Sequence, residues 1–356
     1  NPGPTAHAGG AAGAVASTGA GDGGRARRDG DAFVLESGLV RVVVDASGHV
    51  VSAVELSSGR EALPAGTRGN LLQLHQDFPN MWDAWDVDRH YRGMVVDLDE
   101  ADDVRLDGDA VVVSRAFGSS RIEQRLALAD DGRTLVIDNT VDWHETEKFL
   151  KLAFPVDVFT DRAAAETQFG FHARTTHENT SWEDARFETH TQRWFLVEEP
   201  GFGVAFLNDS SYGFDVARVE RDGRITQDAR FSMLRAPRFP DPRADLGLQT
   251  MRFGVTIGAD AGVATDAAWR LNAPVRPASG RPVPALVTAS DSAVLVSAVK
   301  LADDRDGDLI VRVYESRGGR ARATVTVHTG DVDGIRAANL LELEGDALAV
   351  AAGEGS

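Results

Sequence analysis

Cysteine is absent from all 356 residues of the chain. This absence excludes disulfides, thiolate nucleophiles and iron–sulfur clusters, and it leaves histidine and carboxylates to bind any metal. Lysine is nearly absent as well, because arginine supplies all but three of the 37 basic residues. With 55 acidic residues the formal net charge is -18. The electrostatic field of this net negative charge therefore repels nucleic acid, and the chain lacks the basic patch that usually binds a membrane surface.

Long hydrophobic runs are missing too. The sequence contains no stretch of 18 apolar residues, which a membrane-spanning helix would require. The first residues lack a basic start followed by a leucine-rich run, so they do not match an export signal. We therefore expect a cytoplasmic protein. Residues 1–30 hold nine Gly, eight Ala and no aromatic residue, and such a segment cannot offset its ordering entropy. This composition predicts a flexible linker or tail, with further polypeptide expected before it.

The rest of the chain is dominated by short segments in which apolar and polar residues alternate. Turn signals such as those at 45–48 and 130–132 separate these segments, whereas helical periodicity is found only at 264–271. Strands without intervening helices predict an all-β domain of antiparallel sheets packed face to face over residues 31–273. The expected strands include 33–36, 39–44, 49–56, 110–115, 122–128, 135–143, 148–157, 193–199, 202–208, 229–235 and 249–257.

Proline marks a boundary after this domain. Four of the 13 prolines lie within residues 274–284. Because proline cannot donate to a strand ladder, this segment is predicted to be a linker. Residues 285–356 then form a second, smaller β-sandwich, with one closing strand fewer than expected. Its predicted strands are 285–302, 308–315, 320–328, 340–344 and 347–351.

Aromatic and acidic residues concentrate between Asp77 and Arg92, where 16 residues include two Trp, one Tyr, four Asp and one His. Such a loop suits a sugar, because an aromatic ring stacks on the C–H face of a pyranose while carboxylates accept from its hydroxyls. The alternative is structural, with the tryptophans closing one edge of the sandwich. The candidate substrate-binding residues of this segment are Trp82, Asp83, Trp85, Asp86 and Tyr91.

A second polar cluster extends from His172 to His190, with three His and four carboxylates in 19 residues. The spacing of its histidines matches no metal-ligand signature, so we predict no metal site. His177 and Trp182 join the substrate-binding candidates, and the alternative for both is ordinary polarity of a solvated loop.

An ordered set of short segments is similar to a known family. The most distinctive is Trp-Asp-Ala-Trp-Asp at 82–86, within the run 69–88. The others lie at 166–170, 176–182, 185–188, 193–194, 203–209, 212–215, 234–237, 240–242, 298–300 and 308–315. Together, over about residues 32 to 350, they resemble the β-rich C-terminal half of glycoside hydrolase family 38 α-mannosidases.

The resemblance implies a galactose-mutarotase-like antiparallel supersandwich followed by a smaller β-sandwich. The whole family enzyme removes α-linked mannose with retention, using an Asp nucleophile, a carboxylic acid/base and one zinc. In the family those groups belong to N-terminal domains that this chain does not contain. The resemblance therefore implies no catalytic residue and no cofactor here, and the chain alone should be inactive. Its expected partners are the parent's own N-terminal catalytic domain and a mannoside or oligosaccharide, and a homo-oligomer is left open.

On this interpretation the loop at 82–92 faces the catalytic domain and helps to wall the glycon subsite. Two alternatives remain. The chain could be a stand-alone carbohydrate-binding module. It could also be a mutarotase-type sugar epimerase, in which His177, Glu183 and His190 would act on the concave face of the sandwich.

Overall fold

The computed structural model describes residues 24–273, 284–328 and 332–349. These residues divide into two compact units, 24–272 and the part that follows it. Each unit is described by itself. Among the described residues, no helix combines the length and the apolar character that crossing a membrane requires.

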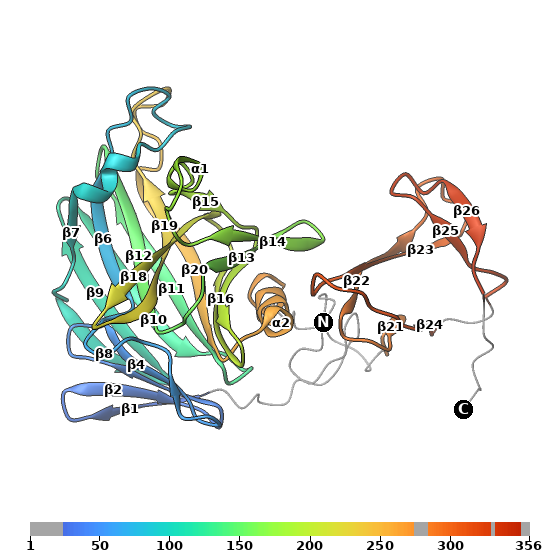
Figure 1. Ribbon diagram of the computed structural model, residues 1–356, viewed down its shortest axis with the longest axis horizontal. Helices are drawn as coiled ribbons and strands as arrows, with labels where there is room; N and C mark the ends of the chain where they lie inside the picture. The colour runs from blue at the N-terminus through green and yellow to red at the C-terminus, as the bar shows by residue number, and fades with distance from the viewer. Residues whose placement is uncertain (1–23, 274–283, 329–331, 350–356) are drawn as a thin grey trace. The chain divides into compact units, whose positions relative to one another are not determined.

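The larger unit contains three antiparallel sheets (Figure 1). The five-stranded sheet has the order β1 (Arg25–Asp29), β2 (Ala32–Glu36), β3 (Val40–Val44), β4 (Val50–Glu55) and β5 (Arg60–Glu61). The six-stranded sheet has the order β15 (Thr189–His190), β18 (Gly213–Arg221), β19 (Arg224–Arg235), β12 (Lys148–Val156), β6 (Leu71–Gln76) and β7 (Val95–Asp97). The nine-stranded sheet has the order β14 (Gly170–Thr175), β13 (Arg162–Thr167), β16 (Trp194–Glu199), β17 (Phe202–Asn208), β20 (Gly247–Ile257), β11 (Thr134–Trp143), β10 (Ser120–Leu128), β9 (Ala110–Phe117) and β8 (Asp103–Asp107).

The core lies between the six-stranded and nine-stranded sheets, where aromatic side chains from both inner faces meet. Phe195 of β16 and Phe206 of β17 contact Phe231 of β19, with ring centroids 5.4 and 5.7 Å apart. The alternation of the sequence produces such an inner face. In β10 every second residue from Ser120 to Leu128 is buried, because successive side chains of a strand point to opposite faces of the sheet. The predicted antiparallel supersandwich is confirmed, and each segment predicted as a strand in this unit overlaps an observed one.

Residues 25–29 correct the prediction of a flexible tail over residues 1–30. They form β1, in which Arg25 lies opposite Glu36 and Asp29 opposite Ala32. The prediction rested on amino-acid composition, which does not reflect the backbone hydrogen bonds that residues 25–29 form with β2. Residues 1–23 of that prediction, and residues 274–283 of the predicted linker, lie outside the described residues.

The described helices are few and short. Helix α2 (Ala261–Asn272) confirms the helical periodicity at 264–271 and buries Ala264, Ala268 and Leu271 in a cluster with residues of β16 and β17. Helix α1 (Ser181–Asp184) has one turn, and η1 (Arg89–Gly93) is a 3₁₀ helix. The last two belong to the two polar segments singled out in the sequence.

The smaller unit is built from antiparallel strand pairs. They are β21 (Val287–Ala289) with β24 (Val325–Val327), β22 (Val294–Leu301) with β23 (Leu309–Glu315), and β25 (Arg336–Ala338) with β26 (Glu344–Ala347). The strand predicted at 340–344 is wrong, because this segment is mostly the turn that joins β25 to β26. The side-chain oxygen of Asn339 accepts from the N–H groups of Leu341 and Leu343 and holds that turn. Such local side-chain bonds compete with strand pairing.

Candidate functional site

Two loops lie side by side at one end of the six-stranded sheet (Figure 1). One follows β6 at residues 77–94, and the other follows β19 at residues 236–246. They meet because β12 pairs with both strands, so that the ends of β6 and β19 flank its first residues. Asp83 joins the loops, since its carboxylate accepts from the backbone N–H groups of Arg238 at 2.6 Å and Phe239 at 2.9 Å.

Arg235 supports this junction from the last position of β19. Its Nε donates to Asp77 at 2.6 Å, and a terminal nitrogen donates to the backbone carbonyl of Asp83 at 3.1 Å. Asp77 is buried, and burial raises the pKa of its carboxyl group while Arg235 opposes that rise. The predicted candidate Asp83 is therefore a bracing residue between two loops, with its carboxylate already hydrogen-bonded.

The two tryptophans of this loop behave differently from Asp83. Trp82 is 62% exposed and Trp85 is 68% exposed, so both rings are available to a contact outside the described fold. The carbonyl of Trp82 accepts from the N–H groups of Trp85 and Asp86, which forms a tight turn. Trp82 has a φ of 60°, in the left-handed region that is uncommon for a bulky residue. Asp86 makes one side-chain contact within the loop, to the N–H of Val87 at 2.9 Å.

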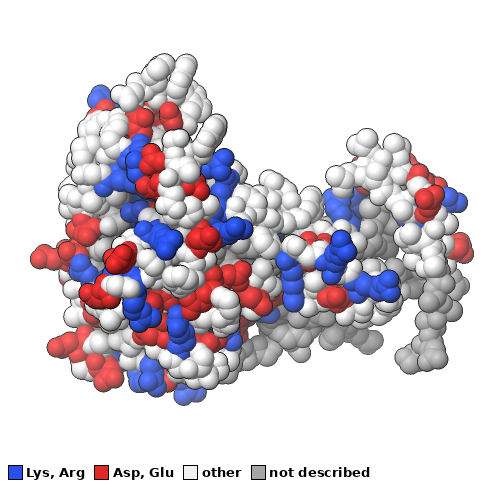
Figure 2. Space-filling view, viewed as in Figure 1, with Lys and Arg blue, Asp and Glu red and all other residues white. Residues whose placement is uncertain are grey.

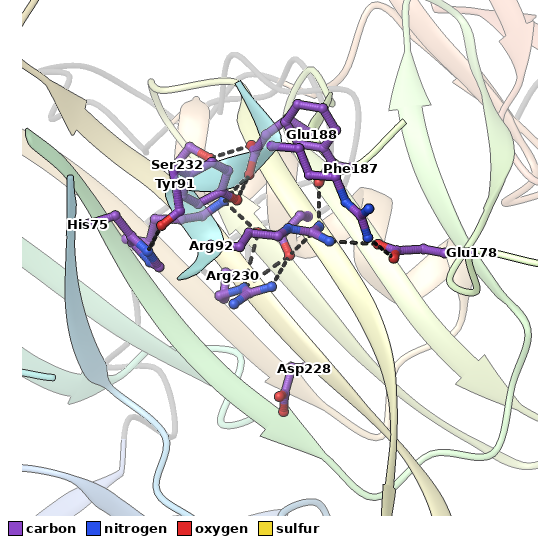
Figure 3. Close-up of polar contacts among 12 residues, drawn as sticks. His75, Tyr91, Arg92, Glu178, Phe187, Glu188, Asp228, Arg230 and Ser232 are labelled. Carbon is purple, nitrogen blue, oxygen red and sulfur yellow. Dashed lines mark hydrogen bonds and ion pairs between the residues drawn. The ribbon is translucent and has the colours of Figure 1, made fainter. Parts of the chain in front are cut away.

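Tyr91, which was predicted to bind substrate, is buried. The residue is 1% exposed, and its hydroxyl donates to Glu188 at 2.5 Å (Figure 3). Burial raises the pKa of Tyr91 to about 12, so the phenol keeps its proton and remains a donor at neutral pH. Its backbone carbonyl accepts from Nδ1 of the buried His75 at 3.3 Å, because a carbonyl can only accept.

A buried ionic cluster surrounds Tyr91 on the six-stranded sheet. Lys151 of β12 is 0% exposed, and its ammonium contacts Glu188, Asp215 at 2.5 Å and the hydroxyl of Tyr91 at 3.2 Å. Arg230 of β19 also binds Asp215, with Nε and a terminal nitrogen 3.0 and 2.5 Å from one carboxylate oxygen. Each buried charge of this cluster thus has at least one partner of the opposite sign.

The pKa values in the cluster follow from these pairings. Burial favours neutral Lys151, yet Asp215 and Glu188 outweigh it and raise the pKa of the ammonium. Burial would raise the pKa of Asp215, but Arg230 and Lys151 hold it well below its usual range. Burial raises the pKa of Glu188 despite Lys151. Because Asp215 is buried, Glu188 is only 16% exposed and both carboxylates are paired, the cluster braces the sheet.

The second polar segment borders a cavity of about 270 Å³ next to this cluster. His177 and Trp182, both predicted candidates, line the cavity, and Trp182 is 77% exposed. Nδ1 of His177 lies 3.3 Å from Glu183, whereas His190 does not line this cavity. The lining residues are Arg92, Ala163, Ala173, Arg174, Thr175, Thr176, His177, Glu178, Thr180, Trp182, Glu183, Arg186, Phe187, Thr189, Phe214, Asp215 and Val216.

Ion pairs connect the two polar segments. Glu178 binds Arg89 at 2.5 Å and Arg92 at 2.6 Å, and Arg89 also binds Asp184 of α1 at 2.7 Å. Figure 3 shows Arg92 between Glu178 and the buried cluster. Basic and acidic side chains are accordingly intermixed over the part of the surface formed by η1 and α1 (Figure 2). The structure therefore brings His177 and Trp182 next to η1, but it places the exposed tryptophans 82 and 85 outside the cavity lining.

Sequence reasoning missed Lys151, Arg174, Asp215, Arg230 and Arg235. One signal was available for Lys151, because it is the one polar residue in the run 149–156 of β12, and a buried lysine requires a partner. Among the described residues, no group of three or more His, Asp or Glu is arranged to hold a metal ion. The family resemblance implies a zinc in the N-terminal domains and none in this chain.

Comparisons with known proteins agree on one family. The family described as Glycosyl hydrolases family 38 C-terminal domain matches residues 35–243. The Glycosyl hydrolases family 38 C-terminal beta sandwich domain matches residues 293–353. A solved structure, an alpha-mannosidase from Enterococcus faecalis V583, overlaps with a TM-score of 0.69 at 15% identity, covering 89% of this chain and 40% of that chain. At this identity the overlap shows a shared fold.

Curated relatives are longer than the chain. It is 38% identical over 304 residues to Alpha-mannosidase 2C1 from Homo sapiens, covering 80% of this chain and 28% of that protein. It is 28% identical over 334 residues to Alpha-mannosidase from Saccharomyces cerevisiae, covering 83% of this chain and 30% of that protein. The chain thus spans less than a third of the length of these relatives.

Proposed function

Because the chain belongs to the glycosyl hydrolases family 38 C-terminal domains, we propose that it is the C-terminal β portion of a larger α-mannosidase. One observation carries this proposal: a protein named an alpha-mannosidase is 38% identical to the chain, which spans only 28% of that protein. The parent would hydrolyse α-mannosidic bonds, and this portion would support the catalytic domain that precedes it.

The two joined loops are the surface proposed to meet that domain. Their exposed apolar residues share one end of the six-stranded sheet, and exposed apolar surface gathered in one region is typical of an interaction site. These residues are Phe78, Met81, Trp82, Trp85 and Phe239, each between 47% and 68% exposed. In this arrangement Trp82 and Trp85 help to wall the glycon subsite, where an aromatic face can stack on a sugar ring.

The chemistry itself is proposed to come from the absent domain. Retaining hydrolysis requires two carboxyl groups about 5–5.5 Å apart, one as nucleophile and one as acid and base. The two carboxylates beside Tyr91 already have partners: the buried Asp215 is bound by Lys151 and Arg230, and the partly buried Glu188 is bound by Lys151. We therefore assign both reacting carboxyl groups and the zinc of the family to the catalytic domain, and we expect the chain alone to be inactive.

Hydrolysis of 4-nitrophenyl α-mannoside tests the proposal. The parent protein should release nitrophenol, and the 356-residue chain alone should release none above the buffer rate. The matching galactoside controls for contaminating glycosidases. Cleavage by the isolated chain at rates comparable with known glycosidases would contradict the division of roles.

A carbohydrate-binding module is the second candidate, and the cavity that carries Trp182 on its lining favours it. Calorimetric titration of the chain with mannosides separates the two, because an incomplete subsite should bind only weakly. An epimerase acting through His177 and Glu183 would instead accelerate sugar anomer interconversion, which NMR measures directly.

A further inference from the structure

Two arginines line the cavity beside α1. Arg174 lies on β14, and Arg186 follows α1. Within the described part of the chain, neither guanidinium forms an ion pair, and Nε of Arg174 is buried without a hydrogen-bond acceptor. A buried donor that lacks an acceptor costs free energy, so this geometry is explained best by a ligand that supplies one.

The neighbouring basic groups strengthen this point. Burial and then the charge of Arg186 lower the pKa of Arg174, and both arginines line the same cavity. His172 is also on β14, and burial, Arg174 and His190 lower the pKa of its imidazole. In a chain of formal charge -18, basic side chains that repel one another without an intervening carboxylate indicate a position suited to an anion.

The acidic residues of the cavity do not neutralise these arginines. Glu178 is bound by Arg89 and Arg92, and Asp215 by Lys151 and Arg230. Glu183 accepts from the backbone N–H of Thr180 and lies beside His177. The positive charge of Arg174 and Arg186 therefore remains directed at the cavity.

The other lining groups define the rest of the ligand. Thr176 is 4% exposed, and its hydroxyl has no hydrogen-bond partner among the described residues. Trp182 presents an exposed indole that could stack on an apolar face. A volume of about 270 Å³ is near the small end of ligand sites, which suits one sugar ring rather than an oligosaccharide.

We propose that this cavity binds an acidic monosaccharide, a sugar phosphate or a uronate, whose oxyanion pairs with Arg174 and Arg186. The guanidinium fork matches both phosphate and carboxylate, so the shared chemistry is the oxyanion. The sugar half of the proposal rests on the proposed function, whereas the anion half rests on the two arginines alone.

Calorimetric titration of the whole chain tests the proposal, with mannose 6-phosphate and mannuronate as probes and mannose as the neutral control. At least one acidic sugar should bind about tenfold more tightly than mannose, as one hydrogen bond to a charged group provides. Its affinity should fall as salt is added. If both acidic sugars bind no better than mannose, the proposal is overturned, and comparison of the two distinguishes phosphate from carboxylate.

Variants locate the binding. Arg174→Gln and Arg186→Gln should each weaken the acidic sugar about tenfold and leave mannose unaffected. Arg121→Gln on β10 is the matched control, because it removes the same charge from an exposed arginine six strands away in the nine-stranded sheet. Equal weakening by all three variants would overturn the proposal. The titration involves no hydrolysis, so its failure is distinguishable from failure of the proposed function.

Discussion

Lys151 Nζ and Asp215 Oδ2 lie 2.5 Å apart, although the two residues are 64 positions apart along the chain. Lys151 is 0% exposed and Asp215 is 2% exposed, so water solvates neither charge. Removing one member of a buried pair leaves the other charge without compensation, which is far more damaging than loss of a surface pair. The ion pair between these residues of strands β12 and β18 therefore contributes to the stability of the larger unit.

Lys151→Met should destabilise the chain by about 3–5 kcal/mol, because Asp215 and Glu188 would then lose a buried cation. Urea unfolding measures the change. Lys148→Met is the control on the same strand, where a partly exposed lysine should cost less than about 0.5 kcal/mol. Adding Glu188→Gln to Lys151→Met should recover part of the loss. A cost below about 1 kcal/mol for Lys151→Met would contradict a paired buried cluster.

His75 should make the stability fall in mild acid. Burial, followed by the charge of Lys151, lowers the pKa of His75 to about 4, whereas an unfolded histidine titrates near pH 6.5. The unfolded chain therefore takes up the proton first, and stability present above about pH 6.5 is lost as the pH falls toward 4. Between pH 7 and 5 the loss from this residue should be about 2 kcal/mol.

Urea unfolding at both pH values measures this loss, and His75→Phe should remove it from the difference. His144→Gln, which replaces an exposed histidine, is the comparison variant. The same decrease in both variants would show that other groups cause it.

Trp85→Ala in the intact parent should lower kcat/KM for an α-mannoside about tenfold, as expected when a stacking contact with the sugar is lost. The thermal midpoint should change little, because the side chain is 68% exposed. Phe159→Ala is the matched control, since Phe159 is also 68% exposed but follows the opposite end of β12. Parallel losses of activity and thermal stability would favour a purely structural tryptophan.

Asp83→Ala should loosen both loops at the end of the six-stranded sheet. It removes the acceptor of two charge-assisted hydrogen bonds from Arg238 and Phe239, at a cost of about 1 kcal/mol. Amide hydrogen exchange should accelerate at residues 78–88 and 236–246. Asp86→Ala serves as control, because among the described residues the carboxylate of Asp86 accepts only from the N–H of its neighbour Val87. Unchanged exchange in Asp83→Ala would refute the bracing role.

Most strands could be predicted because their cause is local. The alternation at 122–128 and 135–143 appears directly as the buried and exposed positions of β10 and β11. Strand β13 was not predicted, since its three consecutive alanines carry little strand propensity. Its pairing with β14 and β16 stabilises it instead, and Ala163 and Ala165 are buried there.

The residues of the candidate site could be predicted from the sequence only in part. Composition drew attention to Trp82, Trp85 and Trp182, and all three indoles are exposed, the first two on the loop after β6 and the third on helix α1. Burial of Tyr91 was not foreseeable from its acidic, aromatic neighbourhood, because its partner Glu188 lies 97 residues further along the chain. The period of the hydrophobic residues and the residue types of the turns depend on neighbours along the chain, so both can be recognised in the sequence. Ion pairs and cavities form between residues that lie far apart in the sequence and meet only in the folded sandwich. The partners of Lys151, and the lack of an acceptor for Nε of Arg174 among the described residues, therefore depended on the tertiary structure.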